Sequence, residues 1–216
     1  MSLFGNMDLA GLIANIPALL IGFAFHEYAH AWAAGKLGDP TPEARGRLTL
    51  NPLAHLDPIG TVLALVFRFG WAKPVPINPY NFRNPIRGRM LVSLAGPVTN
   101  LIIALIATMA LVFMQYLPVG GGDSTVSQIL WAIVQMNLGL GVFNLLPVPP
   151  LDGFAILAGL LPQRWALKLY ALEPYGMIIL AFVLITNVAG LVLSPIVGLL
   201  WRGYLSIAYM IVGLLS

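Results

Sequence analysis

Two histidines, with a glutamate beside the first, stand near the start of the chain in the stretch HEYAH, from His26 to His30. On a helix, residues four apart lie on one face with their β-carbons about 6 Å apart, close enough for two imidazoles to share one metal ion. In the zinc metallopeptidase arrangement, the glutamate next to the first histidine is not a ligand but takes a proton from the metal-bound water. The pattern therefore predicts His26 and His30 as zinc ligands and Glu27 as general base.

A third ligand must come from elsewhere, because a catalytic zinc ion usually has three protein ligands and one open position for water. The chain contains no cysteine, which leaves imidazole and carboxylate groups. Glu43 would have to fold back toward the helix, and His55 and Asp57 lie in a proline-bounded loop typical of turns. Asp152 is favoured, since the apolar stretch before it should end on the same side of the membrane as the first one. Its alternative role is to cap a helix that begins near Phe154.

The composition places these residues in a membrane. Hydrophobic residues make up 59% of the 216 residues and charged residues 9%, and the mean hydropathy is +0.87. Such a chain cannot form the surface of a soluble domain, whose residues are about one-quarter charged, so we expect an integral membrane protein in contact with the lipid bilayer. The net charge of +3 is small, and the basic residues lie in short loops. No nucleic-acid partner is therefore predicted.

Five apolar stretches are long enough to cross a bilayer as helices, which takes roughly 20 residues. A sixth, Ile59 to Phe67, is about half that length and is predicted to be re-entrant or half-crossing. Alternating residue types from Arg47 to Leu50 favour a short β-hairpin-like loop at the membrane surface. We therefore predict one all-α polytopic membrane domain over residues 1–216. The five stretches are Leu9 to Ala34, Met90 to Leu117, Val126 to Leu146, Pro174 to Leu193 and Pro195 to Leu215, the last two divided by the helix-breaking Ser194-Pro195 step.

Positive charges predict the orientation, because short cytoplasmic loops carry an excess of Lys and Arg. The segment from Gly35 to Arg89 carries eight of them, whereas the loop from Pro118 to Thr125 carries none. Arg164 and Lys168 follow the third apolar stretch, as alternating crossings require. This pattern places the N-terminus outside, the C-terminus inside and the HEYAH stretch toward the cytoplasmic side.

Two separated motifs, FHEYAH (Phe25 to His30) and NLLPVPPLDG (Asn144 to Gly153), together resemble the site-2 proteases, a family of intramembrane zinc metalloproteases. SLAGPVTN (Ser93 to Asn100) and GWAKPVPIN (Gly70 to Asn78) are also similar to that family. The likeness is greatest to its compact bacterial and archaeal branch, which lacks PDZ and CBS domains.

This resemblance implies Zn²⁺ bound by His26, His30 and Asp152, with Glu27 as general base, in a multi-pass protein of a prokaryotic cell membrane. The implied substrate is a transmembrane protein or peptide, unwound near Asn144. A membrane metal-ion binding or transport protein would use the same site, but transport usually requires further polar residues along a route through the bilayer. A proteolytically silent zinc-binding scaffold would not need Glu27.

Three of the motifs have alternative roles. Asn144 could hold the substrate backbone or satisfy backbone groups at the end of a proline-interrupted helix. The small residues from Ser93 to Asn100 favour close helix packing, and Asn100 could also make a polar contact near the site. The loop from Gly70 to Phe82 could line or gate the water entrance, or anchor the chain at the membrane interface.

Overall fold

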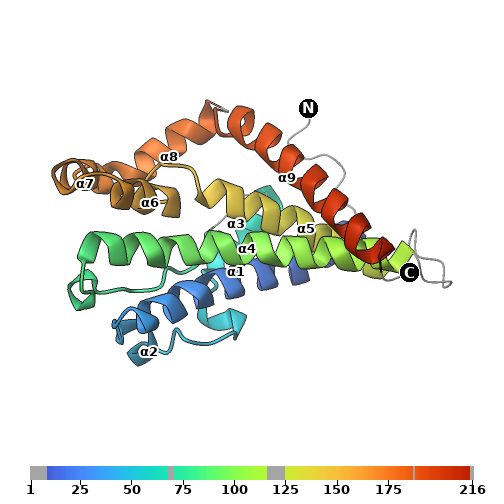
Figure 1. The fold of residues 1–216 in the computed structure, drawn as a ribbon, viewed down its shortest axis with the longest axis horizontal. Coiled ribbons are helices and arrows are strands. Elements are labelled where there is room, and N and C mark those ends of the chain that lie inside the picture. Colours follow the sequence, from blue (N-terminus) through green and yellow to red (C-terminus); the bar gives the residue numbers. More distant parts are fainter. Residues whose placement is uncertain (1–8, 68–70, 116–124, 187, 215–216) are drawn as a thin grey trace.

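The computed structural model describes residues 9–67, 71–115, 125–186 and 188–214. Within these ranges the chain is mostly helical (Figure 1), which confirms the predicted all-α class. Arg68 and residues 118–124, which entered the orientation prediction, lie outside the described residues. The elements are α1 (Leu9–Lys36), α2 (Thr41–Ala44), η1 (Pro52–Ala54), α3 (Pro58–Phe67), η2 (Pro79–Asn81), α4 (Pro85–Gln115), α5 (Thr125–Asn144), α6 (Asp152–Leu160), α7 (Gln163–Tyr170), η3 (Glu173–Tyr175), α8 (Gly176–Ile185) and α9 (Val188–Gly213).

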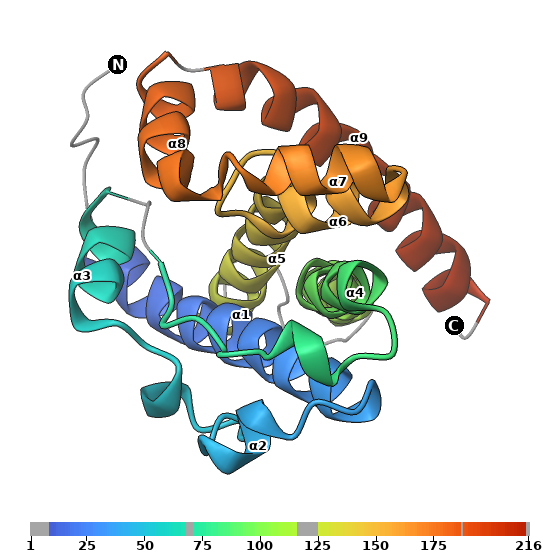
Figure 2. The same cartoon turned by 90° about the vertical axis from the view of Figure 1, so that its left-hand side faces the viewer.

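Helices α1, α4 and α5 form the centre of the molecule, where they pack against one another (Figures 1 and 2). Small side chains at their contacts, Ala18 of α1 and Ala104 and Ala107 of α4, pack with Val134 and Leu138 of α5. Between apolar helices in lipid, small residues of this kind allow the backbones to approach closely. This core carries the HEYAH stretch on α1 and the SLAGPVTN stretch on α4.

Several predicted spans coincide with helices. The first three match α1, α4 and α5, and the short sixth stretch matches α3. Helix α1 has 28 residues, which corresponds to about 42 Å at the α-helical rise. Lengths and compositions of this kind fit a polytopic membrane protein. Within the described residues, four helical stretches are long and apolar enough to cross a membrane, namely Pro85–Gln115, Thr125–Asn144, Gln163–Ile185 and Ala189–Gly213.

The predicted division at Ser194-Pro195 is wrong, because Pro195 lies inside α9. The chain instead breaks after Ile185, where α8 ends. There the Thr186 hydroxyl donates a hydrogen bond to the Phe182 carbonyl and satisfies an acceptor at the helix end. A proline removes a single backbone donor, and transmembrane helices tolerate it where neighbouring groups satisfy the freed carbonyl.

The direction of α9 also differs from the prediction. Tyr204 of α9 donates to the Leu101 carbonyl, and Tyr209 donates to Gln115 at the end of α4, so α9 runs parallel to α4. Its C-terminal end therefore lies at the end of the bundle opposite the basic segment, not beside it as predicted. The intervening stretch makes no simple return crossing, because α7 lies across the end of the bundle (Figure 2) and α8 has only 10 residues.

The loop between α1 and α4 contains no strand at the predicted position. Residues 47–50 form no regular secondary structure and bend at Leu48, and the β pairing of the described residues is one bridge between Leu56 and Ala72. The two parts of the loop are held together by the buried Arg47 instead of by paired strands, because its guanidinium donates to the carbonyls of Ala54 and Pro74. A single cation therefore joins the two halves of this loop.

The fully buried Asp39 fastens the same loop further along the chain. Its carboxylate accepts hydrogen bonds from Thr41, from the backbone N–H of Asn78 and from the side chain of Asn81. Burial favours the neutral acid, but these hydrogen bonds hold the pKa of the Asp39 carboxyl below its ordinary value. Residues 74–77 are thus held between the contacts of Arg47 and those of Asp39.

Candidate active site

Helix α1 presents the HEYAH residues to α4. The side chains of His26, Glu27 and His30 are buried, with exposed fractions of 6%, 8% and 8%. Gly96 of α4 makes room for them: a β-carbon there would lie 2.6 Å from Cε1 of both His26 and His30. The small residues of the SLAGPVTN stretch therefore seat the two imidazoles, in addition to allowing the helices to pack.

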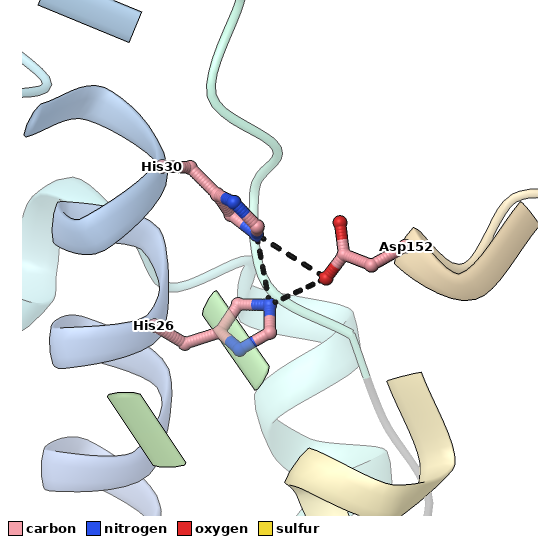
Figure 3. A group of neighbouring side chains, drawn as sticks. All are labelled: His26, His30 and Asp152. Atoms are coloured by element: carbon pink, nitrogen blue, oxygen red, sulfur yellow. Dashed lines mark hydrogen bonds and ion pairs between the residues drawn. The ribbon is translucent and has the colours of Figure 1, made fainter. Parts of the chain in front are cut away.

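The side chains of His26, His30 and Asp152 converge from α1 and from the start of α6 (Figure 3). The two Nε2 atoms lie 3.0 Å apart, and Oδ2 of Asp152 lies 3.2 Å from Nε2 of His26 and 3.3 Å from that of His30. The fold thus brings together the three residues that the sequence predicted as zinc ligands, from positions far apart in the chain.

The remaining nitrogen of each ring has a hydrogen-bond partner. His30 Nδ1 lies 2.8 Å from the carbonyl oxygen of Val92, and His26 Nδ1 lies 2.6 Å from Oδ1 of Asn100. Both partners are oxygen acceptors, so each Nδ1 carries a proton, and in the neutral rings that bind metal each Nε2 has a lone pair. Two lone pairs and a carboxylate oxygen therefore face one another, which is unfavourable unless a cation lies between them.

This donor set fits a zinc ion. Two imidazoles and one carboxylate are hard or borderline ligands of the kind found in catalytic zinc sites. Ligand atoms about 2.05 Å from a tetrahedral ion would be about 3.3 Å apart, and the observed separations are 3.0, 3.2 and 3.3 Å. His26, His30 and Asp152 could therefore hold zinc with little rearrangement.

Asp152 begins α6 but does not cap it. The cap position is Leu151, and no side chain caps the helix by a hydrogen bond. The capping role that the sequence left open is therefore wrong, because the carboxylate faces the imidazoles instead of the helix. Gly153 permits the close approach of this turn to the end of α5: a β-carbon there would lie 2.2 Å from the Leu145 carbonyl oxygen.

A cavity of about 180 Å³ adjoins these three side chains. This volume is large enough to hold water molecules beside the three side chains. Asn144 lines it while donating to the Leu140 carbonyl at 3.0 Å, so this side chain satisfies a helix-end acceptor and also borders the site. The lining comes from α1 (His26, Glu27, His30), the loop (Pro74, Val75, Ile77), α4 (Val92, Ser93), the end of α5 (Asn144), the connection to α6 (Pro150) and the start of α6 (Asp152).

The other third-ligand candidates have different partners. Glu43 is exposed on α2, and Nε2 of the buried His55 lies 2.7 Å from the Thr49 carbonyl oxygen. Asp57 accepts from the backbone N–H of Gly60 in the first turn of α3. Within the described residues, His26, His30 and Asp152 form the one group with three side chains placed to bind a metal ion.

The sequence analysis left one contribution to this site undecided and missed another. The loop residues Pro74, Val75 and Ile77 line the cavity directly, a role left undecided between lining and anchoring. Asn137 of α5 hydrogen-bonds to Asn100 and was not singled out at all. The available signal was its polarity within an apolar span, because polar residues in transmembrane helices commonly join helices.

A buried imidazole and carboxylate cluster with a glutamate in one cavity, set among apolar helices, is the arrangement that a membrane metallopeptidase requires. The sequence pattern of "Peptidase family M50" matches residues 122–186, which include Asp152. The "Putative zinc metalloprotease YwhC" of Bacillus subtilis (strain 168) is 43% identical over 183 residues, covering 83% of this chain and 84% of that protein. The chain therefore belongs to peptidase family M50, the site-2 protease family, and is a zinc metalloprotease.

Two further relatives extend this likeness to other organisms. The "Putative zinc metalloprotease Rip2" of Mycobacterium tuberculosis (strain ATCC 25618 / H37Rv) is 32% identical over 184 residues, covering 81% of this chain and 66% of that protein. The "Putative zinc metalloprotease MJ0611" of Methanocaldococcus jannaschii is 27% identical over 157 residues, 71% of this chain and 74% of that protein. No solved structure matches the chain. The predicted family and its zinc dependence are confirmed by these relationships.

Proposed function

We propose that the protein is an intramembrane zinc endopeptidase that hydrolyses a peptide bond in or near a transmembrane segment of a membrane-protein substrate. The observation that carries this proposal is the position of Glu27, which lines the same cavity as His26, His30 and Asp152. A structural zinc centre is closed by four ligands and needs neither a base nor a cavity. A hydrolytic centre needs both.

The proposed division of labour follows from the geometry. His26, His30 and Asp152 hold the ion, which when bound polarises a carbonyl group and lowers the pKa of water. Glu27 acts as general base: it takes a proton from the attacking water and passes it to the leaving amine. Glu27 lines the same cavity as the proposed ligands, where the attacking water would lie.

Asn144 is the proposed substrate-binding residue. The carbonyls of a transmembrane helix are hydrogen-bonded within that helix, so a scissile bond must leave helical geometry before a cavity of about 180 Å³ can admit it. Backbone groups released in this way need new partners, and the Asn144 amide borders the cavity. In the structure this amide donates to the Leu140 carbonyl oxygen at the end of α5.

We place the site toward the cytoplasmic side of a cell membrane. His30 precedes the end of α1 at Lys36 by six residues, which is about 9 Å along the helix. The segment rich in Lys and Arg begins there, and such loops favour the cytoplasmic side. Water would therefore reach the cavity from that end of the bundle.

Metal-ion binding or transport is the alternative function. A transport route would require polar groups across the whole membrane. Beyond the site, Asn137 hydrogen-bonds to Asn100 and Thr108 donates within its own helix. The remaining core of α1, α4 and α5 contains Ala18, Ala104, Val134 and Leu138. The apolar character of that core favours the protease.

The test is cleavage of a single-span model substrate by the detergent-purified full chain, with and without a zinc chelator. Glu27→Gln should retain one zinc per chain and lose cleavage, because the base is removed and the ligands remain. Asp152→Ala should lose both zinc and cleavage. The matched control is Glu43→Gln, which removes an exposed carboxylate on α2 and should leave both properties unchanged.

Three results would contradict the proposal. Cleavage by Glu27→Gln at the wild-type rate would exclude the base, and an unchanged zinc content in Asp152→Ala would remove that residue from the ligand set. Zinc flux into vesicles containing the wild-type chain, without substrate cleavage, would support transport instead.

A further inference from the structure

Two fully buried amides connect His26 to the other helices of the core. Oδ1 of Asn100 lies 2.6 Å from Nδ1 of His26, and Nδ2 of Asn100 lies 3.0 Å from the Gly22 carbonyl oxygen and 2.8 Å from Oδ1 of Asn137. Nδ2 of Asn137 lies 2.9 Å from the carbonyl oxygen of Ile133. A continuous row of hydrogen bonds therefore runs from the backbone of α5 through α4 to the imidazole on α1.

Backbone carbonyls set the direction of every hydrogen bond in this row. The carbonyls of Gly22 and Ile133 can only accept, so the NH₂ groups of Asn100 and Asn137 must face them. Each amide then turns its oxygen the other way, that of Asn137 toward Asn100 and that of Asn100 toward His26. An oxygen at this position requires a proton on Nδ1 of His26, which leaves the lone pair on Nε2, the nitrogen that faces Asp152.

We propose that Asn100 and Asn137 are positioning residues, which hold His26 in the tautomer and ring orientation that bind zinc, without touching the metal or the substrate. This inference rests on the proposed function of the site. His30 needs no such residues, because the backbone carbonyl of Val92 holds its Nδ1 directly. His26 is thus oriented by a side chain and His30 by a backbone carbonyl. Only the partner of His26 can be removed by a side-chain substitution.

A merely structural role would have the two amides join α1, α4 and α5, as polar contacts between transmembrane helices do. The two roles make different demands on Asn100. Joining the helices depends on its NH₂ group, which donates to α1 and α5, whereas orienting His26 depends on its oxygen. Asn100→Asp keeps an oxygen acceptor for His26 and removes both donors, so it separates the two roles.

The experiment measures the zinc dissociation constant of the purified full chain by competition with a chelator, alongside thermal stability after zinc removal. Asn100→Leu should bind zinc about 10- to 100-fold more weakly, the usual effect of removing a partner of a ligating histidine. Asn100→Asp should stay within about threefold of the wild type although it is less stable. Asn137→Leu should weaken binding by a smaller factor, about three- to tenfold, because the Gly22 carbonyl still holds Asn100.

The matched control is Thr108→Val. Thr108 is also a fully buried polar residue of α4, but its hydroxyl donates to the Ala104 carbonyl within the same helix. This variant should change zinc affinity less than twofold.

Equal zinc affinity in Asn100→Leu and the wild type would overturn the inference, as would equal losses in Asn100→Asp and Asn100→Leu. If Asn100→Leu does not fold, the order of the other two variants decides: Asn100→Asp must bind zinc more tightly than Asn137→Leu. Failure of the proposed function would be seen separately, as a wild-type chain that holds no zinc or cleaves equally well with chelator present.

Discussion

The core of α1, α4 and α5 and the later helix α8 are both strongly apolar in sequence, yet they differ in what their side chains contact. The core buries His26, Asn100 and Asn137 among closely packed small residues, whereas Ile178 and Phe182 of α8 are 71% and 66% exposed. Lipid tails are as apolar as leucine, so hydrophobicity alone does not drive helices together in a membrane. Polar and small residues therefore decide which helices of this protein pack around the site.

The strongest test applies the same substitution to the core and to α9, the helix that follows α8. Gly96→Ala places a β-carbon 2.6 Å from atoms of both imidazoles, whereas a β-carbon at Gly198 of α9 meets nothing within 4 Å. Gly96→Ala should abolish stoichiometric zinc binding and cleavage, because the two rings are held by hydrogen bonds and cannot both move aside. Gly198→Ala should leave zinc content unchanged and should not destabilise α9, since Ala favours helices by up to about 1 kcal/mol. Wild-type zinc content in Gly96→Ala would contradict the described packing.

A second pair of variants compares a crowded glycine beside the site with an open one. Gly153→Ala would bring a β-carbon to 2.2 Å from the Leu145 carbonyl oxygen, whereas a β-carbon at Gly139 of α5 meets nothing within 4 Å. The backbone around Leu145 cannot yield to Gly153→Ala without moving the adjacent Asp152. Zinc affinity measured by chelator competition should fall about 10- to 100-fold in Gly153→Ala and remain within a few-fold of wild type in Gly139→Ala. Equal effects would show that Asp152 is not displaced.

The hydrogen bonds of Asp39 to Thr41, Asn78 and Asn81 are buried polar contacts outside the core, and their contribution to stability can be compared with that of the core contacts. A carboxyl whose folded pKa is lowered stabilises the fold above its ordinary pKa near 4, and that contribution is lost as the pH falls through the folded pKa. Asp39→Asn should therefore lower the Tm at pH 7 by about 5 °C, and this difference from the wild type should shrink at pH 3. Thermal unfolding in detergent at both pH values measures it. A difference that is constant with pH would exclude the carboxylate as the cause.

The smallest effect is expected at the exposed surface of α8. Ile178→Ala changes a side chain that is 71% exposed, whereas Leu138→Ala empties a fully buried position in α5. The first should shift the Tm by less than about 2 °C and leave cleavage unchanged, while the second should cost about 2 to 5 kcal/mol through its cavity. A large loss of stability in Ile178→Ala would mean that α8 packs on protein instead of lipid.

The sequence allowed prediction of the helices and of the converging residues for a simple reason. Apolar length and the four-residue spacing of His26 and His30 are local properties, and the membrane restricts the chain to helices. Asp152 could be predicted because successive crossings alternate in direction. The apolar stretch before Asp152 therefore had to end on the same side of the membrane as the helix that carries His26 and His30. These features required no knowledge of side-chain packing.

The features that sequence reasoning missed depend on contacts between distant segments. The alternating residue types at 47–50 favoured a hairpin. In the structure the guanidinium of the buried Arg47 instead joins the two halves of the loop, because it donates to carbonyls in both of them. Asn137 gains its role only from Asn100 on another helix. The parallel course of α9 follows from its contacts with Leu101 and Gln115, which charge counting could not foresee.

The parallel course of α9 also has a practical consequence for labelling the molecule. Helix α9 ends beside Gln115, 19 residues along α4 from Gly96, which is about 28 Å from the imidazoles. An affinity tag or fluorescent protein fused after α9 would therefore lie at the end of the bundle remote from the cavity. Such a fusion can report on expression and sidedness while leaving the approach of substrate unobstructed.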